Sequence, residues 1–84
     1  MDIELVQSLF DANRLDEAMA LLGSADDARA LYMKGRIAWK QGRRSDAISL
    51  YGRASALDPS GPAAVALEQA RQIMDFYNKD LYNP

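Results

Sequence analysis

The chain has 84 residues, of which 49% are hydrophobic and 26% are charged, and its formal net charge at pH 7 is −2. This hydrophobic share suffices for the core of one small domain and argues against a disordered chain. Cysteine and histidine do not occur, which excludes disulfides and thiolate metal sites and removes the commonest general base. The acidic start MDIEL is unlike a secretory signal, and no apolar run is long enough to span a membrane. We therefore expect a cytoplasmic protein that has no metal or cofactor and no membrane partner.

The charges are segregated along the chain. Residues 1–28 carry seven acidic side chains and one basic side chain, whereas residues 29–53 carry seven basic side chains and one acidic side chain. Helices that are adjacent in sequence stack side by side in helical arrays, so we expect the two segments to neutralise each other within one monomer. The alternative is that the basic segment stays free and attracts an acidic partner.

Two short helices are predicted at the start of the chain. The first spans residues 2–12, and its apolar stripe consists of Ile3, Val6, Leu9 and Phe10. The second spans Leu15 to Leu22 and ends at Gly23, because glycine tolerates the left-handed conformation that often follows a helix.

A longer pair of helices is predicted between Ala28 and Pro59. We expect Ser24 or Asp26 to cap the first helix of the pair and Gln41-Gly42 to end it. Ser45 is expected to cap the second helix, and Asp58-Pro59 ends it, because the residue before a proline avoids the helical conformation. The apolar positions are Leu31, Gly35 and Ala38 on the first helix and Ala47, Ile48, Tyr51, Ala54 and Leu57 on the second.

A fifth helix is predicted from Pro62 to about Tyr77, because proline is tolerated in a first helical turn. We expect the helix to turn its apolar stripe inward, since an exposed stripe would be an unusually large apolar patch for a monomer. The alternative is an exposed stripe that supports self-association. The stripe consists of Ala63, Ala66, Leu67, Ala70, Ile73, Met74 and Tyr77. The aromatic tail after this helix is expected to fold back onto it, or alternatively to dock into another chain.

The segment from 26 to 59 resembles one tetratricopeptide repeat, a helical hairpin of about 34 residues. The residues that carry the resemblance are Gly35, Ala47, Tyr51, Ala54 and Pro59, with Leu31 in the place of an opening aromatic residue. Gly35 and Ala47 allow two helices to approach closely, and Tyr51 fills the gap between their turns. Lys34 and Ala38 depart from the family pattern, which prefers leucine and tyrosine at these positions.

Residues 1–24 resemble a degenerate first repeat, in which Ala18 and Leu22 take the places of Ala47 and Tyr51. Because Ala18 and Ala47 are closer together in sequence than the usual period of about 34 residues, the second helix should be more than one turn shorter than the fourth. The resemblance implies an all-α, right-handed antiparallel helix-hairpin array of about five helices. Its expected parts are a single domain over 1–78, comprising a short repeat (1–24), a good repeat (26–59) and a capping helix (60–78), followed by a tail (79–84).

In the family that this chain resembles, the first helix of each repeat lines a concave groove that binds a peptide or a helix. The resemblance therefore assigns partner binding to Gln7, Phe10, Arg29, Tyr32, Arg36, Trp39 and Lys40. Aromatic side chains supply broad apolar contacts, and arginines supply forked donors for carboxylates. Trp39 has an alternative interpretation, in which it packs in the core between the two repeats.

No pattern in the sequence supports catalysis, because there is no Ser/His/Asp set, no glycine-rich phosphate loop and no cluster with metal-ligand spacing. The predicted function is a non-enzymatic adaptor that binds a protein or peptide, which could be acidic. One alternative is a homo-oligomerisation module that uses the fifth helix and the aromatic tail to form a homodimer. A second is nucleic-acid binding through the basic segment 29–53, which is less favoured because the chain is acidic overall.

Overall fold

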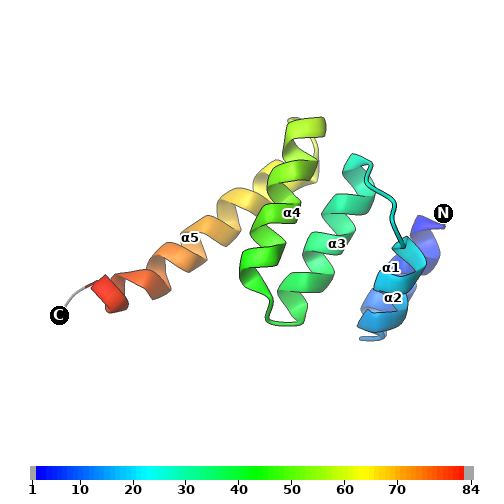
Figure 1. Cartoon of the computed structure of the whole chain (residues 1–84), viewed down its shortest axis with the longest axis horizontal. Helices are drawn as coiled ribbons and strands as arrows, with labels where there is room; N and C mark the ends of the chain where they lie inside the picture. Colours follow the sequence, from blue (N-terminus) through cyan, green and yellow to red (C-terminus); the bar gives the residue numbers. More distant parts are fainter. Residues whose placement is uncertain (1, 83–84) are drawn as a thin grey trace.

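The computed structural model describes residues 2–82, with the side chains through residue 76, and these residues form five α-helices and no strand (Figure 1). The helices are α1 (Ile3–Asp11), α2 (Leu15–Leu22), α3 (Ala28–Lys40), α4 (Arg44–Leu57) and α5 (Pro62–Tyr82). The first four form two consecutive hairpins, and α5 packs mainly on α4. The predicted all-α helix-hairpin array is confirmed. α2 has 8 residues and α4 has 14, which confirms the predicted difference of more than one turn.

The two hairpin turns are built in the same way. The N–H of Arg14 donates to the carbonyl of Leu9, and the N–H of Arg43 donates to that of Ala38, at 2.8 and 2.9 Å. In each turn the preceding residue has a positive φ, 62° at Asn13 and 82° at Gly42, and glycine and asparagine are the residues that tolerate this conformation best. The two turns therefore share one backbone geometry, while the interpretation of residues 1–24 as a degenerate repeat stays a prediction.

The helix starts are capped differently from the sequence prediction. Asp27 caps α3, because its carboxylate accepts the N–H of Ala30 at 2.8 Å; the prediction of Ser24 or Asp26 as the cap is therefore wrong. The prediction of Ser45 as the cap of α4 is also wrong, since α4 begins at Arg44 and Ser45 already lies within its first turn. Arg43 occupies the cap position of α4 without a side-chain capping hydrogen bond.

α3 lies at the centre of the core, because it contributes to every hydrophobic cluster of the described residues. The cluster with α1 and α2 consists of Val6, Ala18, Leu22, Ala30, Met33 and Ile37. The clusters with α4 and α5 consist of Ala38, Ala47, Tyr51 and Ala70, and of Leu31, Ala54 and Ala63. Leu57 was predicted on the apolar face of α4, but it lies at the last turn and is 62% exposed.

Gly35 and Tyr51 make the closest contact between α3 and α4. A Cβ atom placed on Gly35 would lie 2.5 and 2.6 Å from two ring carbons of Tyr51. Real Cβ atoms do not approach other atoms so closely, so the ring of Tyr51 occupies the space that a side chain at residue 35 would need. This arrangement corresponds to the role that the sequence assigned to both residues.

α5 turns most of its predicted stripe towards α3 and α4. Ala63 and Ala70 are buried, and Glu68, Gln69 and Gln72 are exposed. The expected rotation is thus found, except that Ile73 remains 41% exposed. α5 continues to Tyr82, beyond the predicted end near Tyr77 and beyond the boundary proposed at 78. Residues 79–82 therefore extend the helix instead of folding back on it. Residues 83–84 of the predicted tail lie outside the described residues.

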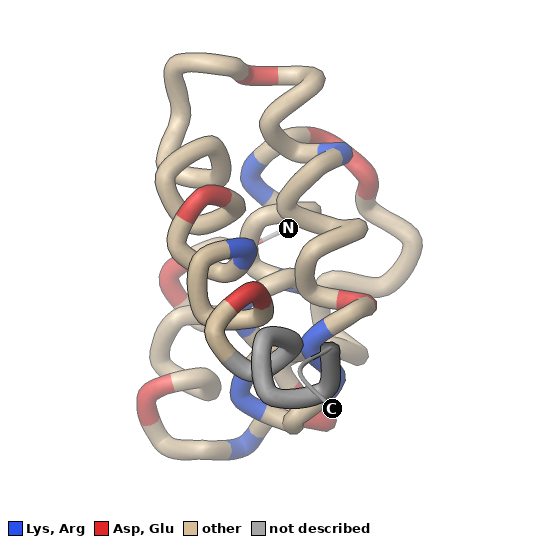
Figure 2. Tube along the Cα trace, turned by 90° about the vertical axis from the view of Figure 1, so that its left-hand side faces the viewer, with Lys and Arg blue, Asp and Glu red and all other residues tan. Residues whose placement is uncertain are grey.

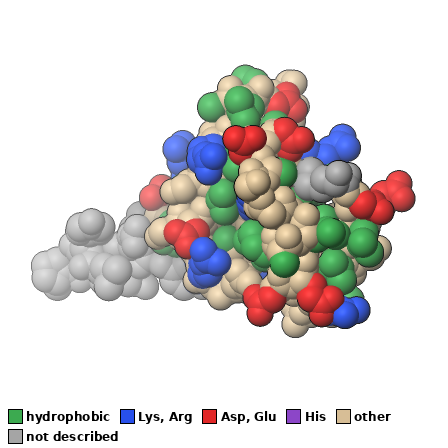
Figure 3. All heavy atoms as spheres, turned by 45° about the vertical axis from the view of Figure 1, so that its right-hand side comes forward, with side chains coloured by type: hydrophobic (Ala, Val, Ile, Leu, Met, Phe, Trp, Pro, Cys, Tyr) green, Lys and Arg blue, Asp and Glu red, His purple; other side chains and the backbone are tan. Residues whose placement is uncertain are grey.

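Several large hydrophobic side chains stay at the surface. Leu5 on α1 is 46% exposed and Leu21 on α2 is 40% exposed. On the face that Figure 3 shows, hydrophobic side chains gather in patches with acidic and basic side chains around them. Some exposed apolar surface of this kind is normal for a folded protein. No helix in the part of the chain that the structure describes is long and apolar enough to cross a membrane.

Candidate functional site

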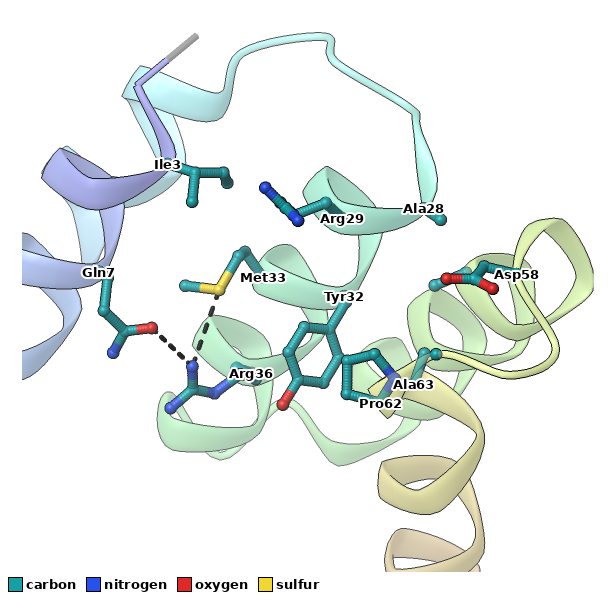
Figure 4. Close-up of a pocket in the computed structure, with 12 residues that line it drawn as sticks. Ile3, Gln7, Ala28, Arg29, Tyr32, Met33, Arg36, Asp58, Pro62 and Ala63 are labelled. Atoms are coloured by element: carbon teal, nitrogen blue, oxygen red, sulfur yellow. Dashed lines mark hydrogen bonds between the residues drawn. The ribbon is translucent and has the colours of Figure 1, made fainter.

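A hollow of about 260 Å³ lies between α1, α3 and the start of α5. Figure 4 shows Ile3 and Gln7 entering it from α1, Arg29, Tyr32, Met33 and Arg36 from α3, and Pro62 and Ala63 from the start of α5. The first helices of the two pairs and the start of α5 supply most of the lining, and Ala54 of α4 and Asp58 at its end complete it. Four predicted binding residues therefore line one hollow: Gln7, Arg29, Tyr32 and Arg36.

Arg36 is held in a fixed position by a chain of hydrogen bonds to α1. Its Nη1 donates to Oε1 of Gln7 at 2.8 Å, and Nε2 of Gln7 donates to the carboxylate of Asp11 at 2.9 Å. The same nitrogen lies 3.7 Å from the sulfur of Met33 (Figure 4). Because Arg36 and Gln7 are half-buried, these contacts reduce the conformational freedom that the arginine would lose when it binds a ligand.

Two cationic side chains lie over the ring of Phe10 beside the hollow. The guanidinium carbon of Arg36 lies 4.4 Å from the centre of the Phe10 ring, and Nζ of Lys40 lies 4.6 Å from it. Lys40 also donates to the backbone carbonyl of Phe10 at 3.3 Å. Cations over an aromatic face are attracted by the ring quadrupole. Phe10 therefore supports Arg36 from the side of the hollow and also holds Lys40, and neither Phe10 nor Lys40 lines the hollow.

Arg29 and Tyr32 complete the α3 side of the hollow. Arg29 is exposed, and among the described residues it has no hydrogen bond or ion pair. Tyr32 is half-buried, and its ring centre lies 6.0 Å from that of Tyr51. Burial, with a smaller contribution from Tyr32, raises the pKa of the Tyr51 hydroxyl to about 12, and Arg36 acts in the opposite direction. The exposed side chain of Arg29 is accessible to a ligand that enters the hollow.

Trp39 lies apart from the other predicted binding residues. It borders a second hollow of about 170 Å³ together with Tyr51, Gln69, Ala70 and Ile73. Trp39 is half-buried, packs against the core cluster around Tyr51, and has the guanidinium carbon of Arg44 5.2 Å from its ring centre. Its position thus combines the two interpretations: one part of the side chain packs against the core, and another borders a hollow that faces α5.

Sequence reasoning missed several residues that line the first hollow, among them Met33, Asp58 and Pro62. Met33 follows Arg29 by four positions and precedes Arg36 by three, so helical spacing places all three on one face. This spacing is a signal that could have identified Met33. No comparable signal marks Asp58 and Pro62, because they reach the hollow only through the way in which α5 returns towards α3.

Three basic residues of α3 contact neutral groups of the preceding segment. Lys34 donates to the carbonyl of Ala25 at 2.7 Å, and Arg36 and Lys40 contact Gln7 and Phe10 as described above. The ion pairs found in the described part of the chain, Arg14–Glu17 and Arg43–Asp46, each lie within one helical turn. Figure 2 shows acidic and basic positions interspersed along the array. Neutralisation of one segment by the other stays a prediction.

The described residues contain no group of three or more acidic side chains that could hold a metal ion.

Together, the helical hairpins, the close Gly35–Tyr51 contact and the hollow on the first helices define a protein of the helical-repeat class. A comparison with protein-family models matches residues 28–60 to the tetratricopeptide repeat. This segment is similar to a tetratricopeptide repeat, and the five-helix, all-α fold fits a small protein of that kind. Searches of the curated proteins and of the solved structures found no significant match. Repeats of this family generally mediate protein–protein interaction and are typically non-enzymatic.

Proposed function

We propose that this chain is a cytoplasmic, non-enzymatic adaptor that binds a segment of another protein in the hollow between α1, α3 and α5. The observation that carries the proposal is the composition of the hollow. Apolar side chains of Ile3, Met33 and Ala63 lie beside two arginines, Arg29 and Arg36. Binding sites of this kind combine apolar surface with a few polar groups that fix the orientation of a ligand.

The two arginines indicate the chemistry of the bound segment. Arg36 is pre-positioned by Gln7, and Arg29 has no competing partner among the described residues. Guanidinium groups bind carboxylates through paired, charge-assisted hydrogen bonds. We therefore propose an extended or helical segment that places an acidic side chain at Arg29 and Arg36 and an aliphatic side chain against Met33 and Ile3.

Fluorescence anisotropy tests this proposal with a set of labelled peptides of about ten residues, a length suited to an extended segment in a short groove. The peptides combine Glu or Asp with Leu or Ile, and matched peptides replace each acid by its amide. We expect binding of the acidic set, loss of binding to the amide set, and a decrease of about tenfold or more for Arg29→Gln. The matched control is Arg53→Gln, an exposed arginine of α4 that does not line the hollow.

The outcome that contradicts the proposal is equal binding by the wild-type protein and Arg29→Gln, or equal binding of the acidic and amide peptides. A single-stranded oligonucleotide included as a competitor tests the nucleic-acid alternative. The net charge of −2 does not favour that alternative, because nucleic-acid-binding domains are usually basic. Displacement of the peptide by the oligonucleotide, with a steep dependence on salt, would support it.

A further inference from the structure

α5 carries a second stripe on the side that faces away from the core. This outer stripe consists of Val65, Gln69, Gln72, Ile73 and Phe76, and all of these side chains are exposed. Val65 is 61% exposed and Phe76 is 69% exposed. The spacing of four, three and four residues from Val65 through Gln69 and Gln72 to Phe76 keeps the stripe on one face of the helix. The charged residues Glu68, Arg71 and Asp75 lie beside the stripe and do not interrupt it.

A closely packed further helix of the same array does not fit this stripe. The repeat length of about 34 residues aligns α5 with α3. In this alignment Val65 corresponds to Leu31, Gln69 to Gly35, and Gln72 to Ala38. In α3 these three positions are buried under α4. Two glutamines in place of glycine and alanine prevent an equally close approach, because the closeness of two packed helices depends on the side chains at the contact. The stripe therefore suits an occupant that packs less closely and satisfies two amide groups.

We infer that this occupant is α5 of a second copy of the chain, packed antiparallel across a two-fold axis. In an interface of this symmetry every contact occurs twice. The stripe of one copy must therefore fit against the same stripe of the other copy, which runs in the opposite direction. Val65 precedes Gln69 by the same four residues by which Gln72 precedes Phe76. One antiparallel register therefore places Val65 against Phe76 of the partner subunit and Gln69 against Gln72 of the partner subunit.

The side chains suit this register chemically. Val65 and Phe76 form an apolar pair at each end, and each glutamine amide can both donate and accept a hydrogen bond at the centre. The outer stripe also continues into the second hollow, because Gln69 and Ile73 belong to both. A helix on the stripe therefore covers the hollow beside Trp39. One helix from each copy makes a small interface, so we expect a dissociation constant in the micromolar range.

The dimer leaves the proposed peptide site open. That hollow is bordered by Pro62 and Ala63 at the start of α5, and Ala63 points to the core side of the helix. The outer stripe lies on the opposite side. Dimerisation therefore does not depend on the proposed adaptor function.

Sedimentation equilibrium and size-exclusion chromatography with light scattering test the dimer between about 1 µM and about 1 mM, a range that brackets a micromolar dissociation constant. We expect the wild-type mass to rise from monomer to dimer. Val65→Glu and Phe76→Glu should remain monomeric, because each places two desolvated carboxylates in the interface. Arg71→Glu, on the flank of α5, is the charge-matched control and should still dimerise. A wild-type monomer at 1 mM, or a dimer that Val65→Glu leaves intact, would overturn the inference.

Disulfide trapping tests the register, and the absence of native cysteine makes it specific. Val65→Cys and Phe76→Cys variants, mixed and oxidised, should form a mixed disulfide. Either variant alone should cross-link poorly, because two copies of residue 65 lie roughly 16 Å apart in this register at a rise of about 1.5 Å per residue. Efficient self-linking of Val65→Cys would instead indicate parallel helices and would contradict the inference. Circular dichroism checks that each variant is folded.

Discussion

Gly35 and Tyr51 show how a single pair of residues sets the distance between two helices. The ring of Tyr51 lies where a Cβ atom of residue 35 would be placed, with ring carbons at 2.5 and 2.6 Å. Tyr51 is itself only 6% exposed, and it belongs to a core cluster with Ala38, Ala47 and Ala70. Its ring therefore has little room to move away from an added methyl group.

We expect Gly35→Ala to destabilise the protein by roughly 1–3 kcal/mol, the usual cost of overpacking a core. Urea denaturation followed by circular dichroism measures the loss. Gly52→Ala is the matched control, because Gly52 lies in the middle of α4 with open space around its Cβ position. That variant should be more stable than wild type by about 0.5–1 kcal/mol, since alanine favours a helix over glycine. Equal effects at both glycines would contradict the proposed contact.

The buried hydroxyl of Tyr51 makes stability depend on alkaline pH. Its pKa in the folded protein is about 12, against 10.0 for an unperturbed tyrosine. The folded state therefore holds the proton more tightly than the unfolded chain does. This contribution to the free energy of unfolding is complete below about pH 10 and is lost as the pH rises towards 12.

Urea denaturation at pH 9 and at pH 11, on either side of the usual tyrosine pKa of about 10, measures this effect. We expect a smaller loss of stability on going to alkaline pH for Tyr51→Phe than for wild type, because phenylalanine keeps the ring and removes the titrating group. Every other side chain is the same in the two proteins, so the difference between them isolates Tyr51. An identical loss in the two proteins would show that Tyr51 is not the group responsible.

At the scale of single elements, the start of α3 depends on one carboxylate. Asp27 accepts the N–H of Ala30, whereas the described contacts include no such bond for Asp26. We expect Asp27→Ala to lower the free energy of unfolding by about 1 kcal/mol, the typical value of a helix cap. Asp26→Ala removes the same charge from the neighbouring position and should change stability by less than half as much. A larger loss at Asp26 than at Asp27, measured by thermal denaturation, would place the cap at residue 26.

Lys34 connects α3 to the linker that joins the two hairpins. Its ammonium group donates to the carbonyl of Ala25 at 2.7 Å in a partly buried position, which accounts for a lysine where the family pattern has leucine. Lys34→Met keeps most of the aliphatic chain and removes this charged donor. We expect a loss of about 1.5–3 kcal/mol, because the carbonyl loses a charge-assisted hydrogen bond.

Hydrogen exchange measures the local consequence of Lys34→Met, and amides of residues 24–27 should exchange faster than in wild type. The matched control is Lys40→Met, because Lys40 is exposed and its bond to the Phe10 carbonyl is longer, at 3.3 Å. Lys40→Met should lower the free energy of unfolding by less than Lys34→Met does. It should leave hydrogen exchange at the linker amides unchanged. Unchanged exchange at 24–27 in Lys34→Met would remove the assigned role of Lys34.

At the scale of the whole molecule, the opposite charges of the two segments should contribute little to stability. The ion pairs of the described residues are more than half exposed at every partner, and such pairs are worth roughly 0–1 kcal/mol each. The cations of α3 reach α1 and the linker through neutral oxygens and an aromatic ring.

Raising NaCl from about 20 mM to about 500 mM shortens the screening length well below 10 Å. We expect this change to lower the free energy of unfolding by about 1 kcal/mol or less, as measured by urea denaturation at both salt concentrations. The binding of acidic peptides should weaken much more over the same range. A loss of several kcal/mol in stability would instead show that attraction between the two segments holds the array together.

The features that the sequence determined by itself are those that depend on neighbouring residues. Gly23, Gly42 and Pro59 end helices through their own backbone preferences, so the ends of α2, α3 and α4 could be predicted. The family pattern over 28–60 rests on a fixed spacing of small and aromatic residues within one hairpin. From that spacing alone, Gly35 and Ala47 could be expected where the two helices approach closely, and Tyr51 in the gap between their turns. The residue that caps α3 could not be predicted from the sequence, because Asp26 and Asp27 are equally good acceptors. Only the path of the linker selects one of them.

Tertiary structure decided the features that join distant segments. Arg36 is positioned by Gln7 and Phe10, which precede it by more than two dozen residues, and no local pattern specifies that contact. Trp39 could not be assigned to the groove or to the core, because its surroundings depend on the angle at which α5 crosses α3 and α4. The outer stripe on α5 became visible only once Ala63 and Ala70 were seen to face the core. The physical reason is that sequence period defines the faces of a helix, whereas packing against other helices decides which face stays exposed.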